Sequence, residues 1–348
     1  MKGRRLAILS LDFYPDPGGV QTYLYEIALR LDSSFRVTVL TSAKGELPPY
    51  TPFEKIQLSH GTARHFRSQL RTMRPDFVLV GHAHPQMLVA AALSGRYAAL
   101  AYGNDFLAAQ ARWHRPLFNR LLRHAEPLIT ISRANQARLD RLGITVDAVV
   151  LPGTDPARFT PPETPVAEPV LLTVGRLVSR KGHRTVLHTL PRLRRHFLGL
   201  RYLVAGVGPE RPRLEALAVE LGVRDAVDFL GHVPEDGLPA LYRRAAVFVM
   251  PVRAEAASVE GFGIVFLEAS ACGLPVVAGG SGGAAEAVRA EDTGLIVPPD
   301  DPDSLGDALL RLLGDPEMRS RMGQSGRKWV ESEMNWDRAA AEIAAALK

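Results

Sequence analysis

A glycine-containing stretch that leads into an apolar helical run, residues 259–273, holds the first side chains that could do chemistry. Glu260 stands directly before Gly261, Phe262 and Gly263. Glycines let a ligand approach the backbone, and the N-terminus of the following helix offers free N–H groups to anionic oxygens. The pattern predicts a phosphate-binding site with the Glu260 carboxylate at its mouth.

Glu268 is the only formal charge between Glu260 and Glu286, and it lies within the apolar run. Because an unpaired buried carboxylate is strongly destabilising, we expect a hydrogen-bonding partner for it. That partner is either a ligand or a neighbouring loop, and both interpretations stay open from these residues alone.

Two cations stand at the start of the second half of the chain. Arg176 directly follows an apolar run, and Lys181 precedes Gly182 and a helical segment. The chain has only 6 lysines against 36 arginines, so a lysine at such a junction is less readily explained as random surface. A guanidinium and an ammonium that converge on one group suit a diphosphate, and two solvated loop cations are the alternative.

Gly18 and Gly19 follow the first apolar run, residues 6–10, and precede a helical segment that runs from Gln21 to Leu31. The order strand, turn, helix places backbone N–H groups at the carboxyl end of a sheet, where anions bind. The turn lacks the G-x-G-x-x-G pattern, so an NAD-dependent dehydrogenase loses its main support.

Strands and helices alternate along the whole chain, which predicts two doubly wound α/β domains with parallel sheets. A length of 348 residues with 46% hydrophobic residues suits two cores. We expect an N-terminal domain at 1–160 and a second domain at 166–332, joined by a proline-rich linker at 159–169. A final helix at 335–348 is long enough to return to the first domain.

The strands are expected at 6–10, 36–41, 76–80, 97–101, 127–131, 147–151, 170–174, 200–205, 226–230, 246–250, 274–278 and 294–297. In the second domain, helices are expected at 182–197, 209–221, 263–272, 283–289, 302–313 and 316–331.

Positive charge is concentrated in the first half. Residues 1–150 contain 19 Lys and Arg against 11 Asp and Glu, a net charge of +8, whereas the remainder contains 23 against 26, a net charge of −3. A basic helical stripe carries much of this excess: Arg64, Arg67, Arg71 and Arg74, opposite Phe66, Leu70 and Met73. A solvated surface helix explains the stripe, and contact with an anionic lipid is the alternative. We expect no nucleic-acid partner, since no aromatic residues interleave with these arginines.

The sequence gives no sign of a metal or a disulfide. Cys272 is the single cysteine, His82 and His84 lack a third ligand at a diagnostic spacing, and no D-x-D motif clearly ends a strand. No run of eighteen apolar residues and no signal-peptide pattern occurs. We therefore expect a cytoplasmic protein without a metal or other cofactor, able to bind the inner face of the plasma membrane peripherally.

With these motifs in view, the chain resembles the retaining glycosyltransferases of family 4, which have the GT-B fold. It is similar to bacterial GDP-mannose-dependent α-mannosyltransferases of the phosphatidylinositol mannoside type. The second domain carries most of the matching stretches, and the first contributes Gly18-Gly-Val-Gln-Thr22. Those in the second domain are Val174-Gly-Arg-Leu-Val-Ser-Arg-Lys-Gly-His183, Val204-Ala-Gly-Val-Gly-Pro-Glu210, Phe229-Leu-Gly-His-Val233, Glu260-Gly-Phe-Gly-Ile-Val-Phe-Leu-Glu268, Ala271-Cys-Gly-Leu-Pro-Val276, Ser281-Gly-Gly283 and Thr293-Gly-Leu-Ile-Val297.

The resemblance implies two Rossmann-like domains that face each other across a cleft, and it implies a role for each matching residue. Glu260, Arg176 and Lys181 would form the catalytic set, in which the two cations hold the donor diphosphate and Glu260 contacts the transferred sugar. The donor would also contact Gly18 and Gly19, and the backbone at Gly261, Phe262 and Gly263. The ribose of the donor would contact Glu268. Its base would lie beside Gly231 and Val233.

One departure concerns the sugar. Members of the family often carry His-Gly where this chain has Tyr102-Gly103. The remaining candidates for sugar or acceptor contacts are Tyr14, His84, Tyr102, Asn104 and Asp105.

The resemblance implies transfer of a hexose, with mannose from GDP-mannose as the first expectation, to a lipid or glycan acceptor. Transfer would proceed without a metal, and the acceptor would attack from the face that the diphosphate leaves. A UDP-sugar-dependent family 4 enzyme that transfers glucose, GlcNAc or galactose is the alternative. A catalytically inactive nucleotide-sugar-binding protein is more remote.

Overall fold

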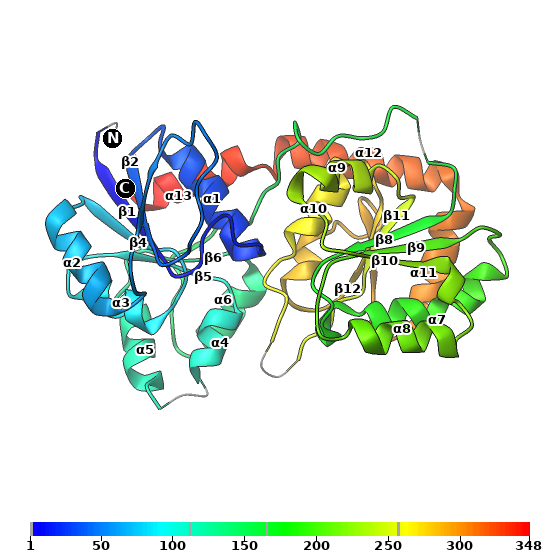
Figure 1. The fold of residues 1–348 in the computed structure, drawn as a ribbon, viewed down its shortest axis with the longest axis horizontal. Coiled ribbons are helices and arrows are strands. Elements are labelled where there is room, and N and C mark those ends of the chain that lie inside the picture. Colours follow the sequence, from blue (N-terminus) through cyan, green and yellow to red (C-terminus); the bar gives the residue numbers. More distant parts are fainter. Residues whose placement is uncertain (1–2, 111–112, 165, 256–257) are drawn as a thin grey trace. The chain divides into compact units, whose positions relative to one another are not determined.

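The chain folds into two units, each built on its own parallel sheet (Figure 1). The computed structural model describes residues 3–110, 113–164, 166–255 and 258–348. Unit 1 comprises the chain up to Pro152 together with Trp336–Lys348, and unit 2 comprises Gly153–Asn335. The chain therefore passes between the units at two places, after Pro152 and after Asn335.

Unit 1 has a seven-stranded sheet in the order β3-β2-β1-β4-β5-β6-β7. Its strands are β1 Arg5–Ser10, β2 Arg36–Thr41, β3 Glu54–Gln57, β4 Phe77–Val80, β5 Ala98–Ala101, β6 Leu128–Thr130 and β7 Ala148–Val149. The helices are α1 Gly19–Leu31, α2 Ala63–Met73, α3 Pro85–Ala92, α4 Asn104–Gln110, α5 Arg115–Arg123, α6 Arg133–Arg141 and α13 Trp336–Ala346. The expected strands are confirmed to within a few residues, and β3 is an addition.

The C-terminal helix α13 packs on α1 of unit 1. Trp336 meets the ring of Tyr23 edge-on, with ring centroids 5.6 Å apart. Arg30 of α1 donates to Asp337 of α13 over 2.7 Å. These contacts hold the two ends of the chain in one unit.

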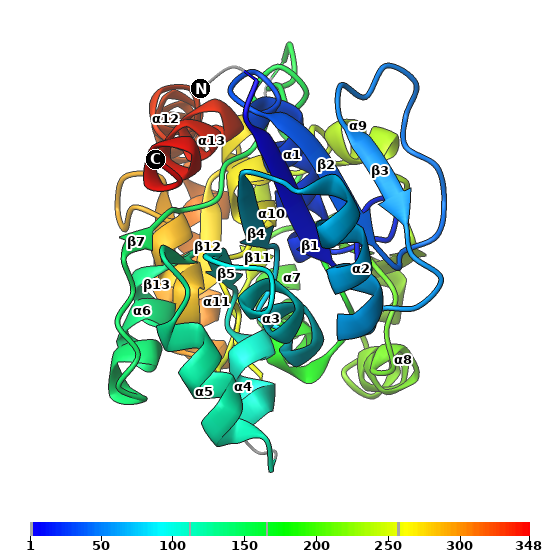
Figure 2. The same ribbon diagram turned by 90° about the vertical axis from the view of Figure 1, so that its left-hand side faces the viewer.

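Helices α2, α3 and α5 pack side by side in unit 1 (Figure 2). The predicted amphipathic pattern of α2 is confirmed, because Phe66 and Leu70 are buried while Arg64 and Arg71 are exposed. Met73, on the apolar side, is half-buried. The basic stripe thus lies on the outer side of α2.

Unit 2 has a six-stranded sheet in the order β10-β9-β8-β11-β12-β13. Its strands are β8 Val170–Val174, β9 Arg201–Ala205, β10 Val227–Gly231, β11 Val247–Met250, β12 Val276–Gly279 and β13 Gly294–Val297. The α-helices are α7 His183–Arg194, α8 Arg211–Glu220, α9 Leu238–Tyr242, α10 Ile264–Ala271, α11 Pro302–Gly314 and α12 Pro316–Ser332. Short 3-10 turns are η1 Ser179–Lys181, η2 Arg224–Ala226, η3 Glu235–Gly237 and η4 Gly282–Ala287.

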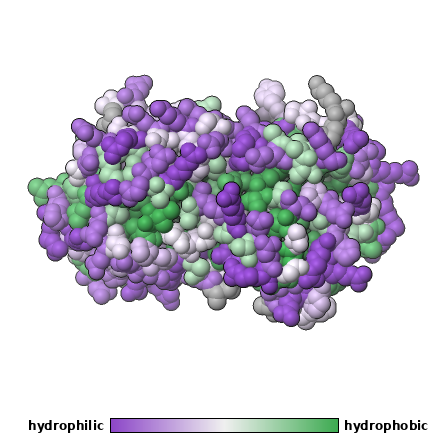
Figure 3. All heavy atoms as spheres, turned by 180° about the vertical axis from the view of Figure 1, so that it is seen from behind, coloured by the Kyte–Doolittle hydropathy of each residue, from purple (hydrophilic) through white to green (hydrophobic). Residues whose placement is uncertain are grey.

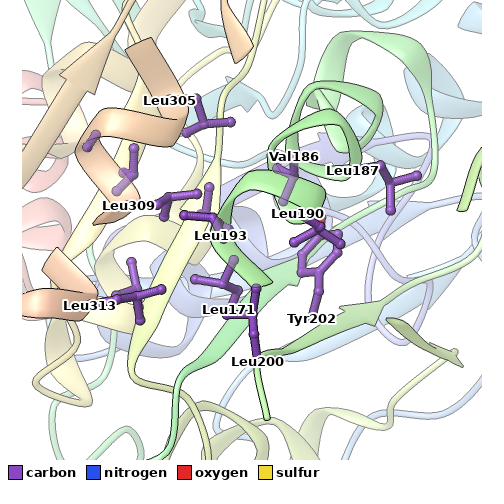
Figure 4. Close-up of a cluster of buried hydrophobic side chains, with 14 of the residues drawn as sticks. Leu171, Val186, Leu187, Leu190, Leu193, Leu200, Tyr202, Leu305, Leu309 and Leu313 are labelled. Carbon is purple, nitrogen blue, oxygen red and sulfur yellow. The ribbon is translucent and has the colours of Figure 1, made fainter. Parts of the chain in front are cut away.

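The core of unit 2 forms where α7 and α11 cover the sheet (Figure 4). Leu190 and Leu193 of α7 and Leu309 of α11 are completely buried, together with Leu171 of β8. Fully burying one such side chain contributes about 1.5–3 kcal/mol, so this packing fixes α7 against the strand that precedes it.

The proline-rich segment expected as a linker is instead part of unit 2. Arg327 of α12 donates to the carbonyl oxygens of Pro156 and Phe159, at 2.8 and 2.6 Å. The Phe159 side chain is buried against Tyr242, with ring centroids 5.7 Å apart. The segment is thus fixed to unit 2 by hydrogen bonds and burial.

The helix expected at 283–289 is also wrong in type. The chain forms the 3-10 turn η4 there. Gly283 packs closely on the loop that carries Gly261, because a Cβ at this position would lie 2.0 Å from the Gly261 carbonyl oxygen.

On the face drawn in Figure 3, hydrophilic residues predominate and apolar patches lie between them. Within the described ranges, every helix is too short or too polar to cross a bilayer.

Candidate functional site

The strand order in the sheet of unit 2 reverses between β8 and β11. The chain continues from β8 to β9 and β10 on one side, and from β11 to β12 and β13 on the other. In open α/β sheets, ligands bind at the carboxyl ends of the strands that flank such a switch point. The loops after β8 and β11 therefore mark the candidate site.

A tight turn after β8 carries the two cations of this site. Residues Ser179–Lys181 form η1, and Gly182 ends the turn with a φ of 75°. A Cβ at Gly182 would lie 2.3 Å from the carbonyl oxygen of Pro251, so only glycine allows this turn to pack on the loop after β11. The packing brings η1 toward Glu260.

Arg180 and Lys181 converge on a single carboxylate oxygen. Lys181 Nζ lies 2.8 Å from Glu260 Oε2, and the Arg180 guanidinium pairs with the same oxygen. Arg180 and Lys181 are only 6% and 7% exposed, and the Glu260 side chain is 12% exposed. The three side chains form a buried ionic triad with a net charge of +1.

The triad sets the ionisation of its members. Burial raises the pKa of Glu260, but the charges and hydrogen bonds of Lys181 and Arg180 outweigh that effect and hold it at about 2. Burial lowers the pKa of Lys181, Glu260 opposes this, and Arg180 and Arg176 lower it further. Glu260 is therefore ionised throughout the physiological range and cannot act as a general acid.

Arg176 is not part of the triad. Its side chain is exposed, and its guanidinium makes no hydrogen bond or ion pair with any residue that the structure describes. Its charge still lowers the pKa of Lys181, so Arg176 lies within electrostatic reach of the triad. The second buried cation that pairs with Glu260 is Arg180, which the sequence pattern did not single out.

The loop between Glu260 and α10 has the form that the glycines predicted. Gly263 caps α10 with a φ of 92°, and no side chain caps the N-terminus of this helix. Phe262 is buried. Gly283 donates its N–H to the Glu260 carbonyl oxygen over 3.0 Å, which fixes the backbone that carries the carboxylate. Gly261 and Gly263 thus leave backbone N–H groups beside the triad.

Glu268 lies on α10 and is hydrogen-bonded inside unit 2. The Tyr242 hydroxyl donates to Glu268 Oε2 over 2.6 Å. Burial raises the pKa of Glu268 to about 7, although the Tyr242 hydrogen bond and the Arg158 charge lower it. Two glutamates eight positions apart therefore have widely separated pKa values, which is typical of functional sites.

We expect Glu268→Gln to remove one contribution to the pH dependence of stability. A carboxyl group whose folded-state pKa is raised from 4.5 to about 7 stabilises the fold when protonated. That contribution is lost as the pH rises through this window, by on the order of 2–3 kcal/mol. The buried histidines His82 and His183, whose pKa values are lowered to about 4, change the stability of both proteins equally. The difference in free energy of unfolding between parent and variant, measured in urea at about pH 5 and about pH 8.5, should therefore fall by this amount as the pH rises. An equal change with pH in both proteins would contradict the assignment.

Gly231 and Val233 lie at the carboxyl end of β10, on the same edge of the sheet as the triad. Gly231 ends β10 with a φ of 72°, and its carbonyl oxygen accepts from the Gly206 N–H over 2.7 Å. Val233 is half-buried in the loop that follows. Their contact with a base stays a prediction.

Unit 1 has its own switch point, between β1 and β4. Ser10 Oγ and His82 Nδ1 lie 3.3 Å apart across it, and burial lowers the pKa of His82 to about 4. His84 caps α3 by accepting from the Gln86 N–H over 3.3 Å. Within the described ranges, no three His, Cys, Asp or Glu side chains gather closely enough to bind a metal together.

The candidate sugar or acceptor contacts of unit 1 differ in exposure. Tyr102 is buried with its ring against Tyr23, and its hydroxyl does not reach the surface. Its contact with a sugar stays a prediction. Asn104 is exposed at the start of α4. Tyr14 is half-buried and stacks on Tyr25, with ring centroids 4.4 Å apart.

Asp105 holds the loop after β5 rather than pointing outward. Its carboxylate accepts backbone N–H groups from Gly103 and Phe106 at 2.9 Å, from Ala83 at 3.0 Å and from Tyr102 at 3.1 Å. With both oxygens occupied in this way, Asp105 positions the loop and is not a free ligand for a sugar.

Sequence comparison identifies the same two halves of the chain. The pattern described as "Glycosyl transferases group 1" matches residues 157–329, and the pattern described as "Glycosyltransferase Family 4" matches residues 17–158. The first match contains the triad, Glu268 and the loop after β10, and the second contains both glycines at 18 and 19.

Two relatives cover almost the whole chain. A "GDP-mannose-dependent alpha-(1-6)-phosphatidylinositol monomannoside mannosyltransferase" of Mycobacterium tuberculosis is 34% identical over 99% of this chain and 98% of its own. A GDP-mannose-dependent monoacylated alpha-(1-6)-phosphatidylinositol monomannoside mannosyltransferase of Corynebacterium glutamicum is 32% identical over 96% of this chain and 95% of its own.

The fold recurs in solved structures of lower identity. Sucrose-phosphate synthase from Thermosynechococcus elongatus superposes with a TM-score of 0.84 at 23% identity, over 98% of each chain. The two parallel sheets and this likeness confirm the GT-B fold. Because both family patterns match, and a relative is 34% identical along nearly the entire length, this chain belongs to glycosyltransferase family 4 and is a hexosyltransferase.

Proposed function

We propose that the enzyme transfers a mannosyl group from GDP-mannose to a lipid acceptor, with retention of configuration and without a metal. The observation that carries the proposal is the convergence of two buried cations on one oxygen at the switch point of unit 2. The choice of donor and acceptor is supported by the relatives, whose names specify GDP-mannose and phosphatidylinositol mannosides.

The chemistry follows from where charge develops. When the bond between the sugar's anomeric carbon and the diphosphate breaks, its electron pair moves to a phosphate oxygen. Lys181, Arg180 and Arg176, with the N–H groups before α10, stabilise that oxygen more in the transition state than in the ground state. The acceptor hydroxyl attacks from the face that the diphosphate leaves, and its proton passes to the departing phosphate oxygen.

Glu260 and Glu268 take different parts in this proposal. Glu260, ionised and fixed by its two cations, orients the sugar, and it competes with the diphosphate for Lys181 and Arg180. In its ionised form, Glu268 accepts hydrogen bonds from the ribose hydroxyls. Since burial raises its pKa to about 7, donor affinity should weaken as the pH falls below neutrality.

The test of this function is a thermal-shift panel of GDP, UDP, ADP and their mannose or glucose conjugates. A nucleotide at a hundred times its dissociation constant adds about 2.7 kcal/mol to the free energy of unfolding, enough for a clear shift. We expect GDP and GDP-mannose to stabilise the enzyme and UDP to have little effect. The reverse order would favour the UDP-sugar alternative. Nucleotide binding with neither transfer nor slow hydrolysis of the donor would favour a catalytically inactive protein.

Gly19 should matter for activity and not for folding. It is exposed at the start of α1, and a Cβ added to it would meet no atom within 4 Å. We expect Gly19→Ala to keep or slightly raise the melting temperature, because Ala lowers the entropy of the unfolded chain. Transfer should fall at least roughly tenfold if a phosphate approaches this backbone, since a methyl group would hold it away. Unchanged steady-state kinetics would remove Gly19 from the site.

We propose that the basic stripe of α2, formed by Arg64, Arg67, Arg71 and Arg74, binds the anionic surface that carries the acceptor. The net charge of +8 in residues 1–150 and the exposure of three of these arginines support this. Each contributes about 1 kcal/mol near an anionic surface. Replacing Arg64, Arg67 and Arg71 by Glu should abolish sedimentation with anionic vesicles while GDP binding is unchanged. Retention of the triple variant on the vesicles would exclude the stripe as the contact.

A further inference from the structure

Unit 1 exposes a large aromatic side chain just before α5. Trp113 is 92% exposed, and Leu117, in the first turn of α5, is 53% exposed. The other two tryptophans, Trp329 and Trp336, are buried. Two large apolar side chains this close in sequence and open to water suggest a surface with a binding role.

The packing of α5 fixes which side of this helix faces outward. Phe118 and Leu122 are buried one turn apart on the inner side. At about 100° per residue, Leu117 and Arg120 must then lie on the outer side. The contact between α5 and α3 fixes the orientation of α5, and with it the direction of its outer side, within unit 1 (Figure 2).

Positive charge surrounds these apolar groups. Arg115 and Arg120 are exposed, and neither side chain makes a hydrogen bond or ion pair with another residue in the part of the chain that the structure describes. Arg123, by contrast, is held by the carbonyl oxygen of Gly143 at 2.9 Å. Residues 113–124 contain no Asp or Glu. The charge is therefore complementary to an anionic partner.

We propose that Trp113, Leu117 and Arg120, which we call the α5 anchor, insert into the headgroup region of an anionic bilayer. Tryptophan favours that region because its ring is apolar and its N–H is polar, while arginines bind anionic headgroups. The inference rests on the proposed lipid acceptor and deepens it. The basic stripe of α2 binds the membrane by charge alone, and α3 lies between the two helices. The α5 anchor adds an apolar insertion that sets the depth of the enzyme in the bilayer.

Intrinsic fluorescence of the full-length enzyme tests the α5 anchor, because Trp113 is the exposed one of three tryptophans. The probes are vesicles of phosphatidylcholine alone and of phosphatidylcholine with phosphatidylglycerol. On the anionic vesicles, the emission should shift to shorter wavelength and be quenched by lipids brominated near the headgroup. Trp113→Phe should bind as the parent does but lose the shift.

Binding itself gives a second readout. Trp113→Ala should lower the affinity for anionic vesicles roughly tenfold, because the variant no longer buries this large apolar side chain in the bilayer. Leu198→Ala is the matched control, because Leu198 is 93% exposed in unit 2 and outside the α5 anchor. Melting temperature and GDP binding should be unchanged in both variants, which separates the inference from the proposed function.

Two results would overturn the inference. In the first, the parent binds anionic vesicles through the α2 stripe, while Trp113 emission stays unshifted and accessible to acrylamide. In the second, Trp113 becomes shielded with increasing protein concentration without vesicles, which would identify a second copy of the chain as the partner. Failure of GDP to bind would instead contradict the proposed function and leave the vesicle result to be judged on its own.

Discussion

Replacing Lys181 by Met should reduce the rate constant of glycosyl transfer by roughly 10²–10³-fold, the usual effect of removing one preorganised group that stabilises developing charge. Lys181 is buried at the carboxyl end of β8 and holds its ammonium 2.8 Å from Glu260. The site has excluded water around this charge, so its effect on a departing phosphate oxygen exceeds that of a surface lysine. Methionine keeps most of the apolar length of the side chain and removes only the charge.

The fold should survive this substitution, which makes the kinetic result interpretable. Arg180 still pairs with Glu260, so no buried charge is left without a partner. We expect a melting temperature close to that of the parent and a weaker affinity for GDP. Lys328→Met, at an exposed position of α12, is the control and should change neither quantity. Normal turnover of Lys181→Met under saturating GDP-mannose would remove Lys181 from the transition state.

The sheet strands were predictable because parallel strands buried on both faces are written as short apolar runs. Val170–Val174 and Gly294–Val297 are both strands within one residue of the expected limits. The strand β3, Glu54–Gln57, was missed because it lies at the edge of the sheet, where its polar side chains remain exposed or half-buried. An edge strand needs no apolar run, so periodicity carries no signal for it.

The candidate site was predictable in its motifs and not in its partners. The glycines mark the turns at Gly182 and Gly263, where the backbone is left-handed. The sequence cannot show that Tyr242, 26 positions before Glu268, supplies its hydrogen bond. It also cannot show that Arg180 and Lys181, although adjacent in sequence, are both buried. Only the tight η1 turn directs both side chains inward.

Lys181→Met should weaken GDP binding and slow transfer, whereas Glu260→Gln should strengthen GDP binding and slow transfer. In the parent, one carboxylate neutralises part of the charge of two buried cations. Without it, Arg180 and Lys181 repel each other inside unit 2, and breaking such a buried pair costs about 3–5 kcal/mol of folding stability. We therefore expect a large fall in the melting temperature of the free enzyme. Urea unfolding should show the instability easing as the pH rises, because deprotonation of Lys181 removes one of the repelling charges.

The same change should strengthen product binding, since the diphosphate of GDP no longer competes with Glu260 for the cations. Removing one nearby negative charge is worth at least about 1.4 kcal/mol, which is a tenfold tighter dissociation constant for GDP. Transfer of mannose should nevertheless fall by roughly 10²-fold or more, because the group that orients the sugar has lost its charge. Glu220→Gln, at an exposed site on α8, supplies the control for loss of one carboxylate from unit 2. If Glu260→Gln bound GDP more weakly than the parent, Glu260 would be holding the cations in place for the diphosphate instead of competing with it.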